Sequence, residues 1–168
     1  MASKGNKKIT SAHTGTPKRE GACVVLVKTE WNAPIVDALE RGCVKELKAA
    51  GARFEVLTVP GAVEITHCIK SYWDHVKYRD DRPQAFVALG CVVRGDTPHF
   101  DYVCQSVTHG VTELNLTLPV PVIFGILTVD NEKQAKERIG GKHGHKGSEA
   151  ALTALKMIAL EEGFRKKR

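Results

Sequence analysis

Short, uninterrupted apolar runs alternate along this chain with longer segments whose apolar residues recur at helical spacing. The runs cover residues 22–27, 54–59, 85–93 and 122–127. A strand that reads as one continuous apolar run is buried on both faces, which is typical of parallel sheets covered by helices. Because strands that alternate with helices form right-handed βαβ units, the pattern predicts an α/β fold. We expect a three-layer sandwich in which a four-stranded parallel sheet is flanked by helices.

Helices are predicted between and after these strands, in an arrangement known as flavodoxin-like. The first helix is expected to have Asn32 as its N-cap, Pro34 in its first turn and Gly51 after its end. The others are expected over 63–73, 100–117, 132–139 and 148–162. A polar surface loop is predicted over 74–83, and a glycine-rich loop over 140–147.

The charge of the chain is concentrated at its two ends. Lys and Arg number 25 against 19 Asp and Glu, which gives a net charge of +6. Residues 1–20 carry +4 of this and residues 161–168 carry +2, so the body is neutral. A neutral body argues against a nucleic-acid groove. We predict one domain over 21–162, a flexible basic N-terminal arm over 1–20 and a basic C-terminal tail over 163–168.

Several classes of protein are excluded by what the sequence lacks. No apolar run approaches the roughly 18–20 residues needed to cross a bilayer, and the N-terminus has no apolar signal core. The five cysteines are odd in number, scattered and without a CxxC pair, so we expect reduced core residues: Cys23, Cys43, Cys68, Cys91 and Cys104. His143 and His145 lack a third ligand nearby, so no metal is expected. The prediction is a cytoplasmic protein without membrane or nucleic-acid partners.

The loop after the third predicted strand, over 94–99, is the richest candidate for a site. Ligands of parallel α/β sheets bind beyond the carboxyl ends of the strands. Gly95 permits unusual backbone angles, Thr97 offers a hydroxyl group, and the following helix N-terminus suits a phosphate. His99 stands at that helix start, where the dipole disfavours imidazolium and favours a ring that accepts protons. The alternative is a capped turn with an exposed histidine of no catalytic role.

The loops after the first two strands offer an aromatic ring and a carboxylate. Trp31 is able to stack on a flat heterocycle, or alternatively to act as a hydrophobic staple on its own helix. Glu64, in the segment 60–64, is able to bind hydroxyl groups of a polyol together with backbone N–H groups. It is alternatively a first-turn acid that the helix dipole favours.

A final loop, over 138–147, concentrates cations among glycines. Arg138 is suited to bidentate phosphate binding, and Lys142 and Lys146 to single charged contacts. With Arg94, these cations form a local cluster within a body of zero net charge. The alternative interpretation is a solvated basic loop.

Together these loops resemble the 6,7-dimethyl-8-ribityllumazine synthase family. The stretch RGDTPHFDYV over 94–103 is the most specific part, and the likeness runs in order from about residue 20 to 162. Shorter matching pieces are Trp31-Asn32, VPGAVE over 59–64, PVIFGILT over 121–128 and QAKER over 134–138. The resemblance implies condensation of 5-amino-6-(D-ribitylamino)uracil with 3,4-dihydroxy-2-butanone 4-phosphate, the penultimate step of riboflavin synthesis, without a metal or organic cofactor.

The resemblance also implies a role for individual residues. His99 matches the family's proton-transfer residue, and Arg138 its phosphate-binding arginine. The turn beside the phosphate is matched by Gly95, Asp96 and Thr97. Residues matching the site of the ribityl pyrimidine are Trp31, Asn32, Ala62, Val63, Glu64, Val92, Val93, Phe124 and Lys146. Of these, Phe124 and Lys146 match residues that approach from an adjacent subunit.

The family forms homo-oligomers, so the resemblance implies a pentamer whose sites lie at subunit interfaces. Some members pack twelve pentamers into an icosahedral shell. Pentamer-only fungal members share the tryptophan at the stacking position but carry extra residues between the last two helices. The compact spacing between Arg138 and Lys146 favours a shell. The implied partners are two small-molecule substrates, further copies of the chain and, as a candidate protein partner, riboflavin synthase.

Overall fold

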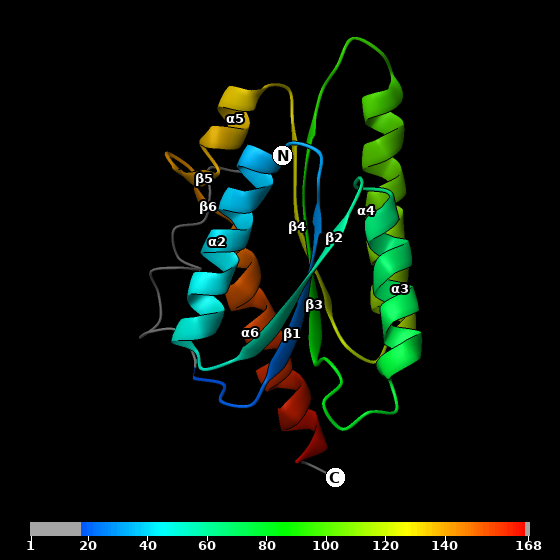
Figure 1. Cartoon of the computed structure of the whole chain (residues 1–168), viewed down its shortest axis with the longest axis vertical. Helices are drawn as coiled ribbons and strands as arrows, with labels where there is room; N and C mark the ends of the chain where they lie inside the picture. Colours follow the sequence, from blue (N-terminus) through cyan, green and yellow to red (C-terminus); the bar gives the residue numbers. More distant parts are fainter. Residues whose placement is uncertain (1–17, 167–168) are drawn as a thin grey trace.

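A twisted parallel sheet lies between two layers of helices in the computed structural model, which describes residues 18–166 (Figure 1). The sheet order is β2-β1-β3-β4. All neighbouring strands run parallel, and their bounds are β1 Cys23–Thr29, β2 Arg53–Val59, β3 Ala85–Val93 and β4 Val122–Val129. The predicted three-layer α/β fold with four parallel strands is therefore confirmed.

Helices cover both faces of this sheet. On one face lie α2 (Ala33–Ala49), α5 (Glu132–Lys136) and α6 (Lys146–Arg165), and on the other lie α3 (Glu64–Val76) and α4 (His99–Thr117) (Figure 1). A small antiparallel hairpin joins α5 to α6 and consists of β5 (Ile139–Gly141) and β6 (Gly144–His145).

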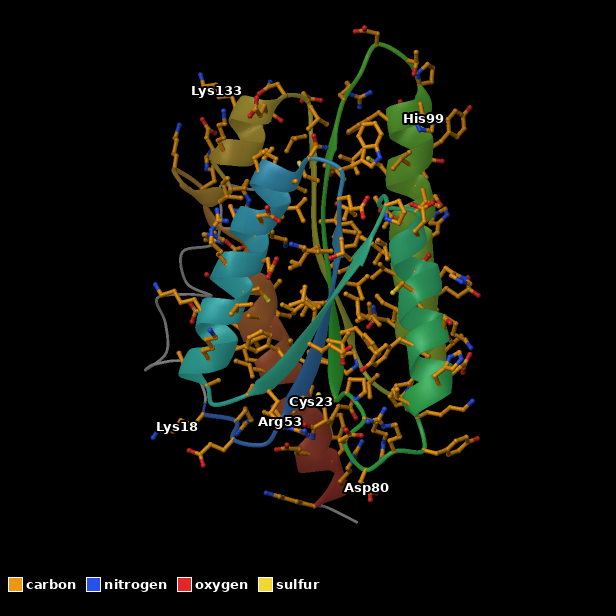
Figure 2. The ribbon with its side chains drawn as sticks, viewed as in Figure 1. Lys18, Cys23, Arg53, Asp80, His99 and Lys133 are labelled. Atoms are coloured by element: carbon orange, nitrogen blue, oxygen red, sulfur yellow. The ribbon has the colours of Figure 1, made fainter. Side chains whose placement is uncertain are left out.

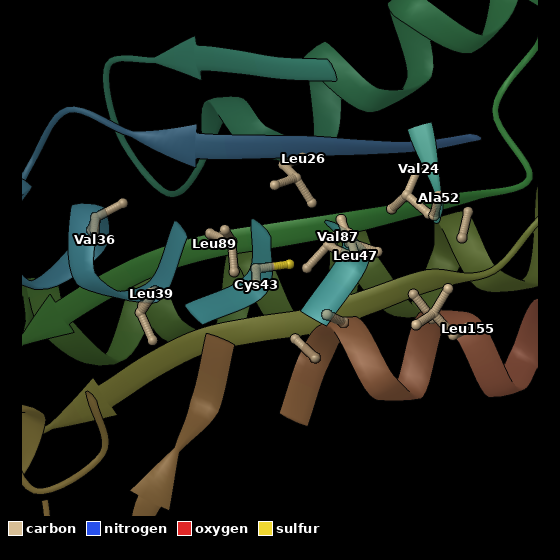
Figure 3. Close-up of a cluster of buried hydrophobic side chains, with 14 of the residues drawn as sticks. Val24, Leu26, Val36, Leu39, Cys43, Leu47, Ala52, Val87, Leu89 and Leu155 are labelled. Carbon is tan, nitrogen blue, oxygen red and sulfur yellow. The ribbon is translucent and has the colours of Figure 1, made fainter. Parts of the chain in front are cut away.

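The continuous apolar runs have a direct structural cause. Along β1, Val24 and Leu26 point into the core beneath α2 and α6, whereas Val25 and Val27 belong to the core beneath α3 and α4. All four side chains are fully buried. Figure 3 shows the first core, in which Leu26 and Leu89 of the sheet face α2. Successive strand residues point to opposite faces, so a strand between two helical layers needs apolar residues at every position.

The contact between α2 and α6 is unusually close because small residues stand at the crossing. A Cβ atom added to Gly147 would lie 1.9 Å from the backbone oxygen of Leu39. The Ser148 hydroxyl donates a hydrogen bond of 3.2 Å to the backbone oxygen of Gly42. This seam brings the C-terminal helix onto the sheet.

Several predicted boundaries are corrected by the structure. The segment expected as a loop over 74–83 begins as helix, because Trp73 and Val76 are buried and α3 continues to Val76. The helix expected over 132–139 ends at Lys136, since Ile139 pairs with His145 in the β5–β6 hairpin. Gly140 and Gly144 have φ of 111° and 83°, values that favour glycine, so the predicted glycine-rich loop is in part this hairpin.

The ends of the chain are described only in part. Helix α6 continues to Arg165, so three residues of the predicted C-terminal tail are helical. Residues 1–17 of the predicted N-terminal arm, and residues 167–168, lie outside the described range. Between residues 18 and 166, no helix has the length and apolar character that crossing a membrane requires. Cys43 and Cys91 are buried in the core as expected, and the other three cysteines are half-buried.

Candidate active site

A cleft opens where β1, β2 and β3 end and α4 begins. Its volume is about 520 Å³, within the range typical of small-molecule sites. It lies at the carboxyl ends of the strands. There, β1 has β2 as its neighbour on one side and β3 on the other, so the chain order reverses direction at β1. Ligands of parallel α/β sheets are expected at such a point. Its lining comprises Thr29, Trp31, Asn32, Gly61, Ala62, Val63, Glu64, Cys91, Val92, Val93, Gly95, Thr97, His99, Phe100 and Val103.

Trp31 forms one wall of the cleft on a firmly held loop. Its backbone N–H donates to the Pro60 carbonyl at 3.3 Å, and its own carbonyl accepts a hydrogen bond of 3.1 Å from the Thr29 hydroxyl. The indole is nevertheless 74% exposed. A ring this exposed contributes little as a hydrophobic staple, which was the alternative interpretation. The arrangement instead offers a flat apolar surface to a ligand.

Asn32 joins the ends of β1 and β3 across the cleft floor. Its side-chain amide donates a hydrogen bond of 2.8 Å to the backbone oxygen of Cys91. The residue adopts the left-handed conformation, with φ of 58° and ψ of 39°, which asparagine tolerates better than most residues. The predicted N-cap position of Asn32 is confirmed, although its side chain forms no capping hydrogen bond and its amide binds the distant Cys91 carbonyl instead.

The turn from β2 into α3 brings a carboxylate into the cleft. Glu64 is the first residue of α3, and a Cβ atom added to Gly61 would lie 2.9 Å from its Oε2 atom. Ala62 and Val63 complete this side of the lining. Glu64 is thus both a first-turn acid at a helix N-terminus and a cleft residue, so the two interpretations of it are compatible.

The start of α4 closes the cleft opposite Trp31. Helix α4 begins at His99, at the end of the molecule where Figure 2 labels this residue, and its N-cap Pro98 provides no side-chain acceptor. The first N–H groups of α4 therefore have no side-chain cap and are oriented as in anion sites of proteins. Gly95, Thr97 and His99 line the cleft, whereas Asp96 is exposed outside it.

Comparison with known proteins identifies the family of this chain. The family model for 6,7-dimethyl-8-ribityllumazine synthase matches residues 21–162. This chain belongs to the 6,7-dimethyl-8-ribityllumazine synthase family. Membership makes it an enzyme, a transferase, of the lumazine synthase type that serves riboflavin biosynthesis.

Curated relatives with the same family name align with this chain over most of their length. The 6,7-dimethyl-8-ribityllumazine synthase of Porphyromonas gingivalis is 50% identical over 135 residues, covering 79% of this chain and 81% of the relative. The enzyme of Bacteroides fragilis is 48% identical over 136 residues, covering 79% and 92%. That of Cytophaga hutchinsonii is 42% identical over 160 residues, covering 94% and 98%.

In this member of the lumazine synthase family, Arg94 is not free to bind a ligand. Its Nη2 atom lies 3.1 Å from Asp101 Oδ1, and its Nε atom lies 3.2 Å from Asp130 Oδ1. The hydrogen bond to Asp101, followed by that to Asp130, raises the guanidinium pKa above its ordinary value. Although Arg94 starts the predicted phosphate loop, its charge is committed to these two carboxylates.

Besides Asp96, three residues that the lumazine synthase resemblance assigns to the site lie outside the cleft of one chain. Arg138 Nη2 forms an ion pair of 3.0 Å with Glu149 Oε2, and the guanidinium also donates to the His143 carbonyl. Lys146 is half-buried at the start of α6, and burial lowers its pKa. Phe124 of β4 packs against the core between the sheet and helices α3 and α4.

Some lining residues of this lumazine synthase family member were not predicted as site residues. Thr29, Cys91, Phe100 and Val103 line the cleft, and the last two belong to the RGDTPHFDYV stretch that carried the resemblance. Burial raises the pKa of the Cys91 thiol to about 11, so this thiol remains protonated near neutral pH. Among residues 18–166, no three His, Cys, Asp or Glu side chains gather as candidate metal ligands.

Proposed function

We propose that the chain condenses 5-amino-6-(D-ribitylamino)uracil with 3,4-dihydroxy-2-butanone 4-phosphate, releasing 6,7-dimethyl-8-ribityllumazine, phosphate and water. Family membership supports this reaction. The observation that carries it to this cleft is the convergence of Trp31, Glu64 and His99 from three successive βα turns. An aromatic surface, a hydroxyl acceptor and a proton-transfer group are what the two substrates require.

The pyrimidine substrate fits the side of the cleft formed by β1, β2 and β3. In this proposal the ring stacks on Trp31, and the backbone of Val92 and Val93 meets its polar edge. The ribityl chain follows the turn of Ala62 and Val63, where the Glu64 carboxylate accepts hydrogen bonds from its hydroxyl groups. The hydrogen bond from Asn32 to the Cys91 carbonyl holds the loop after β1 against the end of β3, on which the pyrimidine rests in this proposal.

The phosphorylated substrate fits the opposite side, at the start of α4. Gly95, Asp96 and Thr97 form the turn beside the phosphate, and the uncapped N–H groups of α4 provide donors for it. His99 moves protons during imine formation, phosphate elimination and ring closure. Holding the two reactants in register supplies much of the remaining acceleration. No metal or organic cofactor is required.

An adjacent copy of the chain completes the site in this proposal. Arg138, Lys146 and Phe124 do not line their own cleft, and a second copy is able to supply them. The cations would neutralise the charge of the phosphate leaving group. Among residues 18–166, the lining of one cleft contains no Arg or Lys and offers the phosphate only backbone N–H groups. We therefore propose a homo-oligomer, a pentamer that assembles further into an icosahedral shell, and riboflavin synthase remains a candidate partner.

The direct test is an assay of lumazine fluorescence with both substrates present. The unsubstituted chain is expected to form product, and His99→Ala is expected to slow it by about 100-fold, the usual contribution of a positioned acid or base. Tight binding of the pyrimidine without product formation would overturn the proposal in favour of a binding module. An unchanged rate in His99→Ala would remove His99 from the mechanism.

Mixing two inactive variants tests the shared site. If His99 and Arg138 act from different copies, mixed oligomers of His99→Ala and Arg138→Ala chains contain some sites with both residues. Random mixing at equal amounts should restore about a quarter of the unsubstituted rate, since each of the two adjacent copies must be the right one. No recovery after verified mixing would show that both residues act within one copy, and an active Arg138→Ala chain on its own would show that Arg138 is dispensable.

A further inference from the structure

We propose that Arg94 is a positioning residue that fixes the turn over 95–99 without touching substrate. The proposal rests on the proposed function, in which this turn and the start of α4 bind the substrate phosphate. It adds a role for one arginine that stands beside the cleft but outside its lining. The guanidinium contacts Asp101, Asp130 and the Phe100 ring, whereas the turn itself has few other contacts.

Arg94 connects three separate segments through its backbone and its guanidinium. Its backbone closes β3, where the Arg94 N–H donates to the Val129 carbonyl at 2.9 Å. Its side chain bridges the first turn of α4, through Asp101 at 3.1 Å, and the segment after β4, through Asp130 at 3.2 Å. Because two edges of one planar group bind two carboxylates, the position of α4 is fixed relative to the sheet edge.

The face of the same guanidinium covers an aromatic ring of the cleft. The Arg94 Cζ atom lies 4.1 Å from the centre of the Phe100 ring. Phe100 lines the cleft next to His99. A planar cation is suited to stack on a ring while its edges form hydrogen bonds, and a lysine ammonium is not. Arg94 therefore also fixes the ring that adjoins the proposed proton-transfer residue.

The turn has few other means of holding its shape. Residues 94–99 are all exposed, and a Cβ atom added to Gly95 would have no atom within 4 Å. Helix α4 has no side-chain N-cap. In the described part of the chain, the side chains of residues 95–99 form no hydrogen bond or ion pair within the protein. Arg94 and its partner Asp101 thus hold the turn at its two ends.

The more distant carboxylate is itself oriented by a neighbour. Gln134 donates from Nε2 to Asp130 Oδ2 at 3.3 Å and accepts from the Asp130 backbone N–H at 2.9 Å. The Asn131 side chain in turn accepts from the Gln134 N–H at 3.0 Å and caps α5. Asp130 is therefore held in the segment directly before the capped helix α5, which makes it suitable for positioning Arg94.

The main experiment measures amide hydrogen exchange in Arg94→Met, which removes the charge and the planar fork. Exchange of the hydrogen-bonded N–H groups at the start of α4, over residues 101–105, should become about fivefold faster, as expected for the loss of partly exposed ion pairs and one ring contact. Exchange in β3 should not change. Arg79→Met is the matched control, because Arg79 also pairs with an aspartate at 3.0 Å but on the 79–82 turn. Unchanged exchange over 101–105 in Arg94→Met would overturn the proposal.

Steady-state kinetics separate positioning from direct phosphate binding. Arg94→Met should raise KM for the phosphorylated substrate about fivefold and leave the Kd of the pyrimidine unchanged. Asp130→Asn should produce part of the same effect, since it loosens Arg94 without removing it, and Arg94→Lys should not restore activity fully. If Asp130→Asn has no effect while Arg94→Met abolishes use of the phosphate, Arg94 binds phosphate itself and the proposal is wrong.

Failure of the proposed function and failure of the Arg94 role give different experimental results. An unsubstituted chain that forms no lumazine would contradict the proposed function. The exchange experiment needs no substrate, so it would still decide whether Arg94 fixes the turn. Equal losses for both substrates in Arg94→Met, with normal exchange over 101–105, would contradict the positioning role while leaving the proposed reaction intact.

Discussion

The imidazole ring of His145 lies directly against the backbone of Gly42. A Cβ atom added to Gly42 would fall 2.1 Å from the His145 Cε1 atom. The same ring accepts a hydrogen bond of 3.4 Å from the Ser148 N–H and so caps α6. One histidine thus determines both how α6 begins and how closely α2 approaches it.

Gly42→Ala should destabilise the protein even though alanine favours helices. The added methyl group must displace the His145 ring, and overpacking of this kind costs about 1–3 kcal/mol. The free energy of unfolding, measured in urea, should fall by that amount. Gly163→Ala is the matched control in α6, where an added Cβ meets nothing within 4 Å, and it should stabilise by up to about 1 kcal/mol. Equal effects of the two substitutions would contradict the steric explanation.

Acid should weaken the fold through His145. Burial lowers the pKa of this ring from its ordinary value of 6.5, so the unfolded chain binds the proton more readily. The stabilising contribution is complete above about pH 6.5 and is lost as the pH falls through the lowered pKa. A proton on Nδ1 would also remove the acceptor for the Ser148 N–H.

His145→Asn isolates this effect, because asparagine is a good N-cap and does not titrate. Between pH 7 and pH 5, the unsubstituted chain should lose about 1 kcal/mol more of its unfolding free energy than the variant, which is the usual worth of a cap. Urea titrations at one protein concentration measure the difference. Parallel losses in both chains would assign the acid sensitivity to other groups.

Asn32→Asp should weaken the cleft floor while keeping the shape of the side chain. The carboxylate has no N–H to donate and would face the Cys91 carbonyl, which we expect to cost about 1–3 kcal/mol of stability. Pyrimidine affinity should fall as well, because Val92 and Val93 follow Cys91 directly. Asn32→Gly tolerates the φ of 58° and creates no repulsion, so its loss should be smaller. Thermal unfolding and equilibrium binding measure the two effects, and a larger loss in the glycine variant would refute this view.

Trp31→Ala should reduce ligand binding without reducing stability. The ring is 74% exposed, so its removal leaves the core intact, whereas loss of stacking typically costs about 1–3 kcal/mol of binding. Trp31→Phe should retain most of the affinity. The other tryptophan, Trp73, is only 7% exposed and distant from the cleft lining, so ligand-dependent quenching should disappear in Trp31→Ala. Persistent quenching would place the ligand elsewhere.

The fold was predictable because its pattern is repeated and local. The run over 85–93 predicted a strand with the observed bounds of β3, since burial on both faces leaves no polar positions. The β5–β6 hairpin was missed because its strands have three and two residues, too few for any periodicity. The end of α3 was missed because charged residues such as Asp74 stand beside the buried Val76 on the same helix.

The cleft was predictable as far as it depends on turns that directly follow strands. Trp31, Glu64 and His99 each stand within a few residues of a predicted strand end. The partners of Asn32 and Arg94 were not predictable, because Cys91 lies 59 residues and Asp130 lies 36 residues away in sequence. No local pattern states which of two polar groups so far apart will meet. Arg138 lies outside the cleft of its own chain, and in the proposed oligomer it reaches the cleft of a neighbouring copy, a contact that no local sequence pattern encodes.

The position of the cleft residues in the sequence has a consequence for how the protein is synthesised. All the cleft lining that one copy supplies among residues 18–166 lies between Thr29 and Val103. Synthesis proceeds from the N-terminus, so the ribosome completes the binding surface before β4 and α6 exist. Yet α6 contributes Leu155 and Ile158 to the core beneath that surface. The last third of the chain is therefore synthesised after the cleft residues, and its packing against the sheet stabilises the fold that positions them.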